Sequence, residues 1–363
     1  MPIASRISAW YFRRALRTGF LQVRLARWSP PAIAVAAVVF AVVWVLFAAS
    51  NAAIHSGSTF LTTLLDGITL AGLLFVVASG FTLIFGLMRV VNMAHGSFFL
   101  LGGYIAVRLQ KHFTHAGVFG LTSEQVKLWQ WVVPALIATG IIAVTGLLVQ
   151  QVFLRWNQGQ DLRQALITIA LSIIFADQIT AHFVRGGSED ISWPTQLGED
   201  KSVHLGSVNY PWSRLFILFA GIVIGVALWL WLKRTRTGMV IRAGVDDRAM
   251  VSALGINIQL TFAIAFLIGS ALAGFGGVMG GSFASVDVGV DANWLLNSLV
   301  VVIIGGMGSL GGAAIGAALY GLVSNFSATY LPAGSTYYAI IFTFVLIALV
   351  LAMRPLGLFG RPA

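Results

Sequence analysis

The sequence predicts an all-α membrane protein that crosses the bilayer about ten times. Of its 363 residues, 58% are hydrophobic and only 9% are charged, and the mean hydropathy is +0.90. Soluble domains carry about 25% charged residues and about 45–50% apolar ones. The apolar residues are gathered in long runs between short polar loops, which is the pattern of helices that satisfy their own backbone hydrogen bonds in lipid.

Ten apolar runs follow one another along the chain, and we expect eight to ten of them to cross the membrane. They occupy roughly residues 32–50, 62–88, 92–110, 131–154, 163–184, 213–232, 258–282, 294–306, 308–324 and 336–353. At about 1.5 Å per residue, the run 294–306 reaches only about 20 Å, against a hydrocarbon core of about 30 Å. We therefore predict that 294–306 and 308–324 are short or discontinuous helices on either side of a glycine-rich turn at 305–312, facing a cavity.

Charge in the loops orients these runs. The net charge is +10, and the basic residues lie beside apolar runs, where they retain a loop in the cytoplasm rather than bind nucleic acid. The loops 155–163 and 233–257 are basic and are expected inside, whereas 185–211 carries most of its charge as Asp and Glu and is expected outside. With ten crossings, the tail 354–363 and the amino terminus are both cytoplasmic.

The amino-terminal segment 1–31 is a separate unit ahead of the transmembrane domain 32–353. Up to residue 28 it contains six arginines and no acidic residue, with aromatic and leucine residues interleaved. This pattern predicts a basic amphipathic helix on the inner membrane surface. A cleaved signal peptide is the alternative, because 48–50 resembles a cleavage site. The basic region is too long for that, and the apolar run exceeds about 7–15 residues, so we favour an uncleaved first crossing.

Catalytic and metal-binding motifs are absent from the sequence. There is no cysteine, which excludes disulfides, thiol catalysis and cysteine metal sites. There is no phosphate-binding loop, zinc-protease helix or nucleophile elbow, so we expect no enzyme activity, no metal and no bound cofactor in this chain. An intramembrane enzyme is a minor alternative. A secondary carrier is another, and it would need a charge relay for which Asp66 and Asp177 are the candidates.

The basic loop between two apolar runs, Lys233 to Ile256, carries a predicted helix. Residues 239–254 suit a short helix with Gly238 before it and Gly255 after it. Met239, Ala243, Met250 and Leu254 can lie near one side of that helix. A short cytoplasmic helix is a feature that a soluble motor protein can bind, and a solvated loop anchored by positive charge is the alternative. The candidate coupling residues are Gly238, Arg242, Ala243, Asp246, Asp247, Arg248, Ala249 and Gly255.

Four stretches, taken in order, resemble the LivH-type permeases, which are membrane subunits of branched-chain amino-acid ABC importers. The first lies within Gly80–Tyr104 and reads Leu-Ile-Phe-Gly-Leu-Met-Arg-Val-Val-Asn-Met-Ala-His-Gly. The others are the coupling loop from Gly238 to Ile256, the glycine-rich Val300–Gly312, and the carboxyl end Met353–Arg361. The resemblance covers roughly residues 60–361. The chain departs from the family in its longer amino terminus, its longer loop 185–211, and Gly311 where many relatives have proline.

The resemblance implies a machine with several subunits in the bacterial inner membrane. A solute-binding protein would deliver substrate to a heterodimer of this chain and a second, LivM-like permease. Two cytoplasmic ATPases would use ATP, and each would bind a coupling helix. The family also includes permeases for urea, short amides, and aromatic or other carboxylates, so the substrate within the family stays open. Lipid is an expected partner and nucleic acid is not.

A path for an amino acid must offer polar contacts without trapping a zwitterion. Neutral polar side chains suit such a path better than fixed charges, because an unpaired charge in the membrane is costly. Asn297 and Ser298, ahead of the glycine-rich segment, and Asn92 and His95 in the first half meet that description. They are the candidate path residues. The alternative is that all four only form hydrogen bonds with neighbouring helices.

Overall fold

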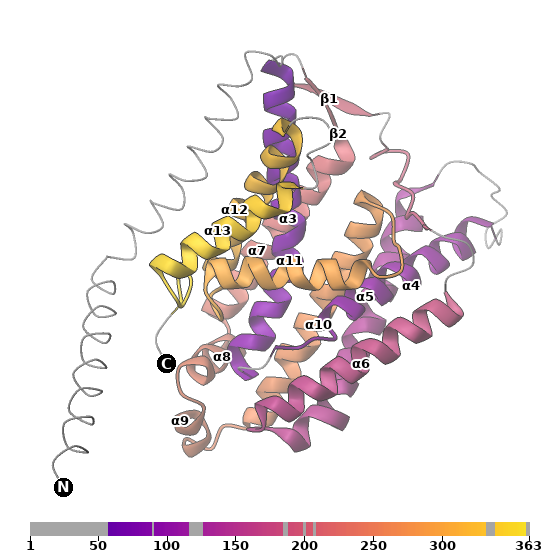
Figure 1. Ribbon diagram of the computed structural model, residues 1–363. Coiled ribbons are helices and arrows are strands. Elements are labelled where there is room, and N and C mark those ends of the chain that lie inside the picture. The colour runs from indigo at the N-terminus through magenta and orange to yellow at the C-terminus, as the bar shows by residue number, and fades with distance from the viewer. Residues whose placement is uncertain are drawn as a thin grey trace, which may run out of the picture.

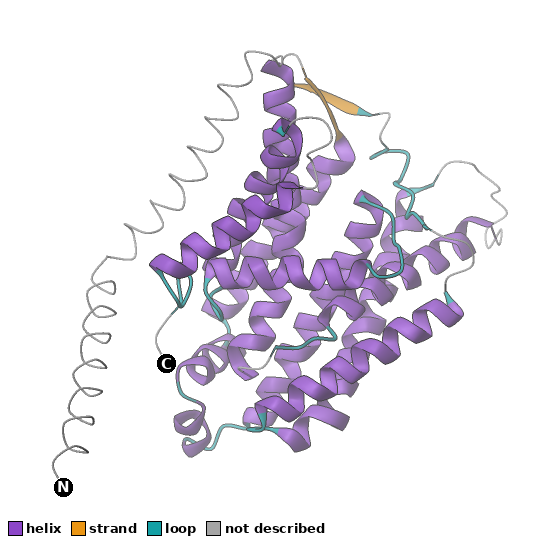
Figure 2. Cartoon of the chain, in the orientation of Figure 1, coloured by secondary structure: helices purple, strands orange, loops and turns teal. Residues whose placement is uncertain are grey.

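The computed structural model describes residues 57–88, 91–115, 126–183, 188–198, 201–205, 208–331 and 338–360. The amino-terminal segment 1–31 and the run 32–50 lie outside these described residues, as do the last three residues of the tail. Within the described part the chain is a bundle of helices with one small hairpin (Figures 1 and 2). This agrees with the all-α membrane fold that the composition predicts.

The helices follow the apolar runs closely. They are α3 Gly57–Met88, α4 His95–His115, α5 Leu128–Val149, α6 Asp161–His182, α7 Trp212–Arg234, α8 Arg236–Asp246, α9 Arg248–Ala253, α10 Ile258–Phe283, α11 Val290–Gly305, α12 Leu310–Tyr330 and α13 Ala339–Met353. A π-helical turn, Gln150–Leu154, and a 3-10 turn, Arg155–Asn157, extend α5. Counting that extension with α5, six helices in the described part are long and apolar enough to cross a membrane, and α11 and α13 are shorter apolar helices.

Two triplets of helices form the centre of the bundle. The first is α3, α4 and α5, and the second is α10, α11 and α12. Helices α3 and α10 pack against each other, and each also packs against the second and third helices of the other triplet. Helix α4 packs on α5 as α11 packs on α12, and α4 meets α11. Since α3 and α10 run in opposite directions (Figure 1), the arrangement resembles the inverted repeats of many transporters.

Glycines let the two triplets approach closely. A Cβ atom added at Gly80 would lie 2.5 Å from the carbonyl oxygen of Gly269, and one at Gly102 would lie 2.6 Å from that of Gly274. These are separations that no side chain tolerates, so glycine at these positions sets the distance between helices. The glycine-rich composition therefore serves close helix packing, as it does in other membrane bundles.

The glycine-rich turn lies where the run lengths predict it. Helix α11 ends at Gly305 and α12 begins at Leu310. Helix α12 is continuous over 21 residues and long enough to cross a membrane, so the prediction of a short or discontinuous helix over 308–324 is wrong. Gly306 and Gly308, between them, have φ angles of 102° and 85°, a left-handed conformation that favours glycine. The backbone N–H groups of Leu358 and Phe359 donate to the last carbonyls of α11, at 2.9 Å each. The end of α11 is thus satisfied by the carboxyl-terminal segment.

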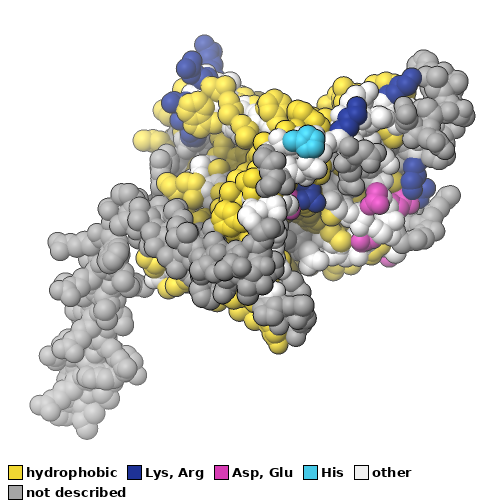
Figure 3. Space-filling model, turned by 90° about the horizontal axis from the view of Figure 1, so that it is seen from above, with side chains coloured by type: hydrophobic (Ala, Val, Ile, Leu, Met, Phe, Trp, Pro, Cys, Tyr) yellow, Lys and Arg dark blue, Asp and Glu magenta, His cyan; other side chains and the backbone are white. Residues whose placement is uncertain are grey.

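The loops that the charge pattern assigns to opposite sides lie at opposite ends of the bundle (Figure 1). One end, the outer end, carries the antiparallel hairpin of β1, Ser202–Leu205, and β2, Val208–Pro211. A backbone bridge between Glu189 and Val286 lies in the same outer region. Viewed from this end, acidic and basic side chains both appear (Figure 3). The other end, the inner end, carries α8 and α9.

Candidate coupling and translocation sites

The coupling loop forms two helices rather than the single helix predicted over 239–254. Helix α8 already begins at Arg236, so Gly238 lies inside its first turn and does not precede it. The chain breaks at Asp247, whose extended backbone (φ −149°, ψ 104°) separates α8 from α9. The cause is capping. The side chain of Thr235 accepts a hydrogen bond from the Gly238 N–H at 3.0 Å, and that of Asp247 accepts one from the Met250 N–H at 3.0 Å.

Gly238 fixes α8 against the end of α7. A Cβ atom at this position would lie 2.5 Å from the carbonyl oxygens of Trp231 and Leu232. The next turn buries Ile241, which packs with the main core cluster. Helix α8 is therefore attached to the transmembrane helices through backbone contact at its start and an apolar side chain further along.

Three large apolar side chains of the same loop are exposed. Met239 is 51% exposed, Met250 62% and Leu254 71%. These are three of the four residues predicted to lie near one side of a helix, and the fourth, Ala243, is exposed as well. Exposed methionine and leucine side chains on two short helices at the end of the bundle suit contact with a protein partner.

The remaining candidate coupling residues lie around this surface. Arg242 and Asp247 are exposed, and Gly255 follows α9 with a left-handed φ of 78°. Asp246 ends α8, and Arg248 and Ala249 begin α9; their side chains lie outside the described part of the structure. The eight positions are thus brought together on one short segment at the inner end.

The candidate path residues of the first triplet are deeply buried. His95 begins α4, and its Nε2 donates to the carbonyl oxygen of Val77 in α3 at 3.0 Å, while its ring meets Phe81 edge-on. The Asn92 side-chain oxygen accepts from the Ala94 N–H at 3.2 Å. His95 Nδ1 and Asn92 Nδ2 have no hydrogen-bond partner in the described structure. Because buried polar atoms are rarely left unpaired, this turn has unused hydrogen-bonding capacity.

The candidate residues of the second triplet are satisfied within their own half. The Ser298 hydroxyl donates to the carbonyl oxygen of Trp294, one turn earlier in α11, at 2.7 Å. The hydroxyl of Tyr320 in α12 donates to the Asn297 side-chain oxygen, also at 2.7 Å. These bonds are what the alternative interpretation, hydrogen bonding within the bundle, leads one to expect for this pair.

The two halves nevertheless meet at the starts of α4 and α11. A Cβ atom at Gly96 would lie 2.3 Å from the carbonyl oxygen of Asp291. The ring of Phe99 stacks on that of Trp294, with centroids 4.6 Å apart. The first turns of α4 and α11 are thus in contact inside the bundle. The sequence pattern alone pairs neither Gly96 with Asp291 nor Phe99 with Trp294.

A polar network at the outer end was not predicted. Asp66 of α3 forms an ion pair with Arg214 of α7 and accepts from the Tyr210 hydroxyl at 3.1 Å. Tyr210, in β2, also bonds the Thr69 hydroxyl at 2.8 Å. Burial raises the pKa of Tyr210 to about 12, so the phenol stays protonated and able to donate. Asp66 therefore has a structural partner, which weakens its candidacy for the charge relay of a secondary carrier.

Sequence comparison agrees with this architecture. A family model described as the branched-chain amino acid transport system permease component matches residues 63–351. The high-affinity branched-chain amino acid transport permease LivH of Salmonella typhimurium is 30% identical over 312 residues, covering 84% of this chain and 96% of that protein. LivH of Escherichia coli K12 is 29% identical over the same length, and BraD of Pseudomonas aeruginosa is 28% identical over 308 residues, both with the same coverage.

Apolar helices of membrane-spanning length, packed together through glycine contacts, define a multi-pass membrane protein. The chain belongs to the family of permease components of branched-chain amino acid transport systems. This confirms the resemblance to LivH-type permeases. The match also begins near the start of α3 and ends in α13, so it spans both triplets.

Proposed function

We propose that this chain is a permease subunit of an ATP-driven importer for branched-chain or related amino acids in a bacterial plasma membrane. It works with a second permease, two cytoplasmic ATPase subunits and an external solute-binding protein. ATP is bound and hydrolysed by the ATPases and not by this chain. Support comes from family membership and from the names of the relatives, all of which are branched-chain amino acid transport permeases.

The observation that carries the coupling role is the arrangement of α8 and α9. Two capped helices at the basic end expose Met239, Met250 and Leu254, while Gly238 and Ile241 join α8 to the transmembrane core. A push on the exposed side is transmitted through these contacts to α7 and α3. A solvated loop would need neither the caps nor the close backbone contact.

The path is proposed to run where the two triplets meet. The unpaired atoms of Asn92 and His95 lie beside the contact between α4 and α11. Small shifts between helices joined by glycine contacts would open a route there, since such interfaces permit two packings of similar energy. In the present arrangement these groups are buried.

Reconstitution tests the proposal. Proteoliposomes containing this permease, its co-purifying permease and ATPases, and the binding protein should accumulate leucine only with ATP on the ATPase side. Uptake of urea, of a short amide and of an aromatic carboxylate, each measured separately, shows which substrate of the family this permease accepts. Uptake that persists with a hydrolysis-deficient ATPase would indicate a secondary carrier and contradict the proposal.

Orientation has its own test, because the chain has no cysteine. Single substitutions His204→Cys in the hairpin and Ser252→Cys in α9 place one thiol at each end. An impermeant thiol reagent added to intact cells should label the first and leave the second unmodified until the membrane is opened. Labelling of both from outside would refute the proposed topology.

A further inference from the structure

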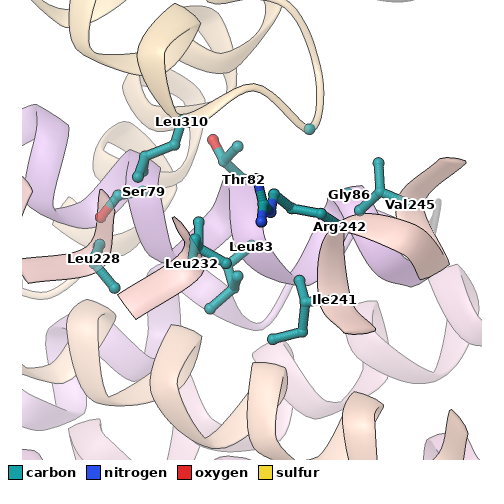
Figure 4. Close-up of a pocket in the computed structure, with 11 residues that line it drawn as sticks. Ser79, Thr82, Leu83, Gly86, Leu228, Leu232, Ile241, Arg242, Val245 and Leu310 are labelled. Atoms are coloured by element: carbon teal, nitrogen blue, oxygen red, sulfur yellow. The ribbon is translucent and has the colours of Figure 1, made fainter. Parts of the chain in front are cut away.

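A cavity lies beneath α8 at the inner end, and the proposed mechanism does not use it. Its volume is about 50 Å³. It is lined by Ser79, Thr82, Leu83 and Gly86 of α3, Leu228 and Leu232 of α7, Ile241, Arg242 and Val245 of α8, and Gly308 and Leu310 at the glycine-rich turn. The side chains come from four separate elements and converge on one space (Figure 4).

Two polar groups in this wall lack partners. The Thr82 hydroxyl is buried and makes no hydrogen bond in the described structure. Arg242 makes no ion pair with the described residues, and its guanidinium extends toward Thr82 (Figure 4). The Ser79 hydroxyl, in contrast, donates a hydrogen bond to the carbonyl oxygen of Val76 at 2.8 Å. The cavity thus presents a cation and one free hydroxyl against an otherwise apolar lining.

We propose that this cavity binds a carboxylate group, held by Arg242 and the Thr82 hydroxyl. A guanidinium presents donors in a fork that matches the two oxygens of a carboxylate, and the hydroxyl donates a further bond. The volume admits a few water-sized groups, which suits a carboxylate but not a whole amino acid. The aliphatic part of such a ligand would contact apolar residues of the lining, such as Leu232 and Leu310.

The ligand has two possible sources with the same chemistry. One is the carboxylate of the transported amino acid as it leaves on the cytoplasmic side, and this source rests on the proposed function. The other is an unrelated small carboxylate from the cytoplasm. A cation is excluded by Arg242, since no carboxylate is among the lining residues. A bound carboxylate would join α8 to α3, the two elements whose relative motion coupling requires.

A reporter thiol tests the proposal in the assembled importer held in nanodiscs. Ser79→Cys is nearly isosteric, and Leu232→Cys is a second reporter on α7 if the first variant does not assemble. Labelling of this chain is followed by mass spectrometry with methanethiosulfonate reagents that differ in charge. The sulfonate reagent should react at least about fivefold faster than the trimethylammonium reagent, because one unit charge nearby shifts the local potential by that order.

Substitutions at the cation show whether Arg242 is the cause. Arg242→Gln should remove the preference for the anionic reagent, and Arg242→Lys should retain most of it. Arg236→Gln is the matched control, because Arg236 is exposed at the start of the same helix and does not line the cavity. If the Arg242→Gln protein showed the same preference for the anionic reagent as the protein with Arg242 intact, the proposal would be overturned.

Protection identifies the ligand chemistry. Leucine and 4-methylpentanoate should each slow labelling at least about threefold, whereas isoamylamine, which lacks the carboxylate, should not. If acetate protects as strongly as leucine, the ligand is any small carboxylate. If acetate protects less than leucine, the ligand is the transported amino acid. Protection by the amine, or by none of the four, refutes the site. ATP-driven uptake of leucine is measured on the same preparation. If uptake is present while protection fails, the carboxylate site is refuted and the proposed function is not.

Discussion

The two ends of the bundle differ in how their polar groups are satisfied. At the outer end, Asp66, Arg214, Tyr210 and Thr69 satisfy one another and fasten the hairpin to α3 and α7. At the inner end, the helices are capped, yet Arg242 stands without an ion pair among the described residues beside a cavity.

The difference indicates which end is built to keep its shape. Breaking the hydrogen bonds of a satisfied network costs about 1–3 kcal/mol for each buried polar group that is left without a partner. The outer end therefore resists rearrangement. A shift of α8 at the inner end would break few polar interactions by comparison, because the Thr82 hydroxyl and Arg242 have no partner to lose among the described residues. A rigid outer end suits docking of a binding protein, and a less constrained inner end suits coupling to a motor.

The largest effect should follow from Gly238→Val, which disrupts the contact between α8 and the end of α7. The added side chain would overlap the carbonyl oxygens of Trp231 and Leu232, since even a Cβ atom comes within 2.5 Å. Helix α8 must move away from α7, and leucine uptake should fall at least about tenfold while ATP hydrolysis continues. Gly244→Ala is the control on the same helix, where the Cβ atom would meet the flexible ends of two side chains, Leu87 at 3.2 Å and Ile258 at 4.0 Å. Equal uptake by the two variants would show that the contact is not used in coupling.

At the outer end, Asp66→Leu should lower stability by about 1–3 kcal/mol. The change leaves Arg214 without its carboxylate in a half-buried position. Thermal unfolding in detergent should show a lower midpoint for this variant than for wild type. The double variant Asp66→Leu with Arg214→Met should recover part of the loss, because no uncompensated charge remains. If the double variant is as unstable as the sum of the two single variants, the pair is not coupled.

Asp247→Ala tests the break between α8 and α9. Loss of the side-chain bond to the Met250 N–H should cost about 1 kcal/mol, and amide hydrogen exchange should accelerate in α9 and not in α7. Asp247→Asn keeps an oxygen acceptor and should exchange almost as slowly as wild type. Unchanged exchange in the alanine variant would mean that the cap does not hold α9.

An effect as small as that of Asp247→Ala is expected from Tyr210→Phe, about 0.5–1.5 kcal/mol, because only the hydroxyl bonds to Thr69 and Asp66 are lost. A pH series adds a check. The folded pKa of about 12 lies above the ordinary value of 10.0, so the folded state favours the protonated phenol. The corresponding stabilisation is fully present below about pH 10 and is lost as the pH rises toward 12. If wild type were no more stable than the Tyr210→Phe variant already at pH 8, the raised pKa of Tyr210 would be contradicted.

The composition and run lengths of the sequence determined much of the fold. Long apolar runs must become helices in lipid, since no other local structure satisfies the backbone there. The shortness of 294–306 and the glycines after it predicted the turn between α11 and α12, because length and backbone freedom are local properties. The family followed from ordered motifs, whose spacing needs no three-dimensional information.

The tertiary structure alone decided which groups meet. Asp66 and Arg214 are far apart in the chain, and periodicity gives each a helix but not a partner. The unpaired hydroxyl of Thr82 and the cavity beside Arg242 arise only when α3, α7, α8 and the glycine-rich turn converge. Even the break at Asp247 reflects a competition between a continuous helix and a capped restart. Local pattern records what each segment prefers, whereas burial and pairing depend on contacts between segments that the pattern does not contain.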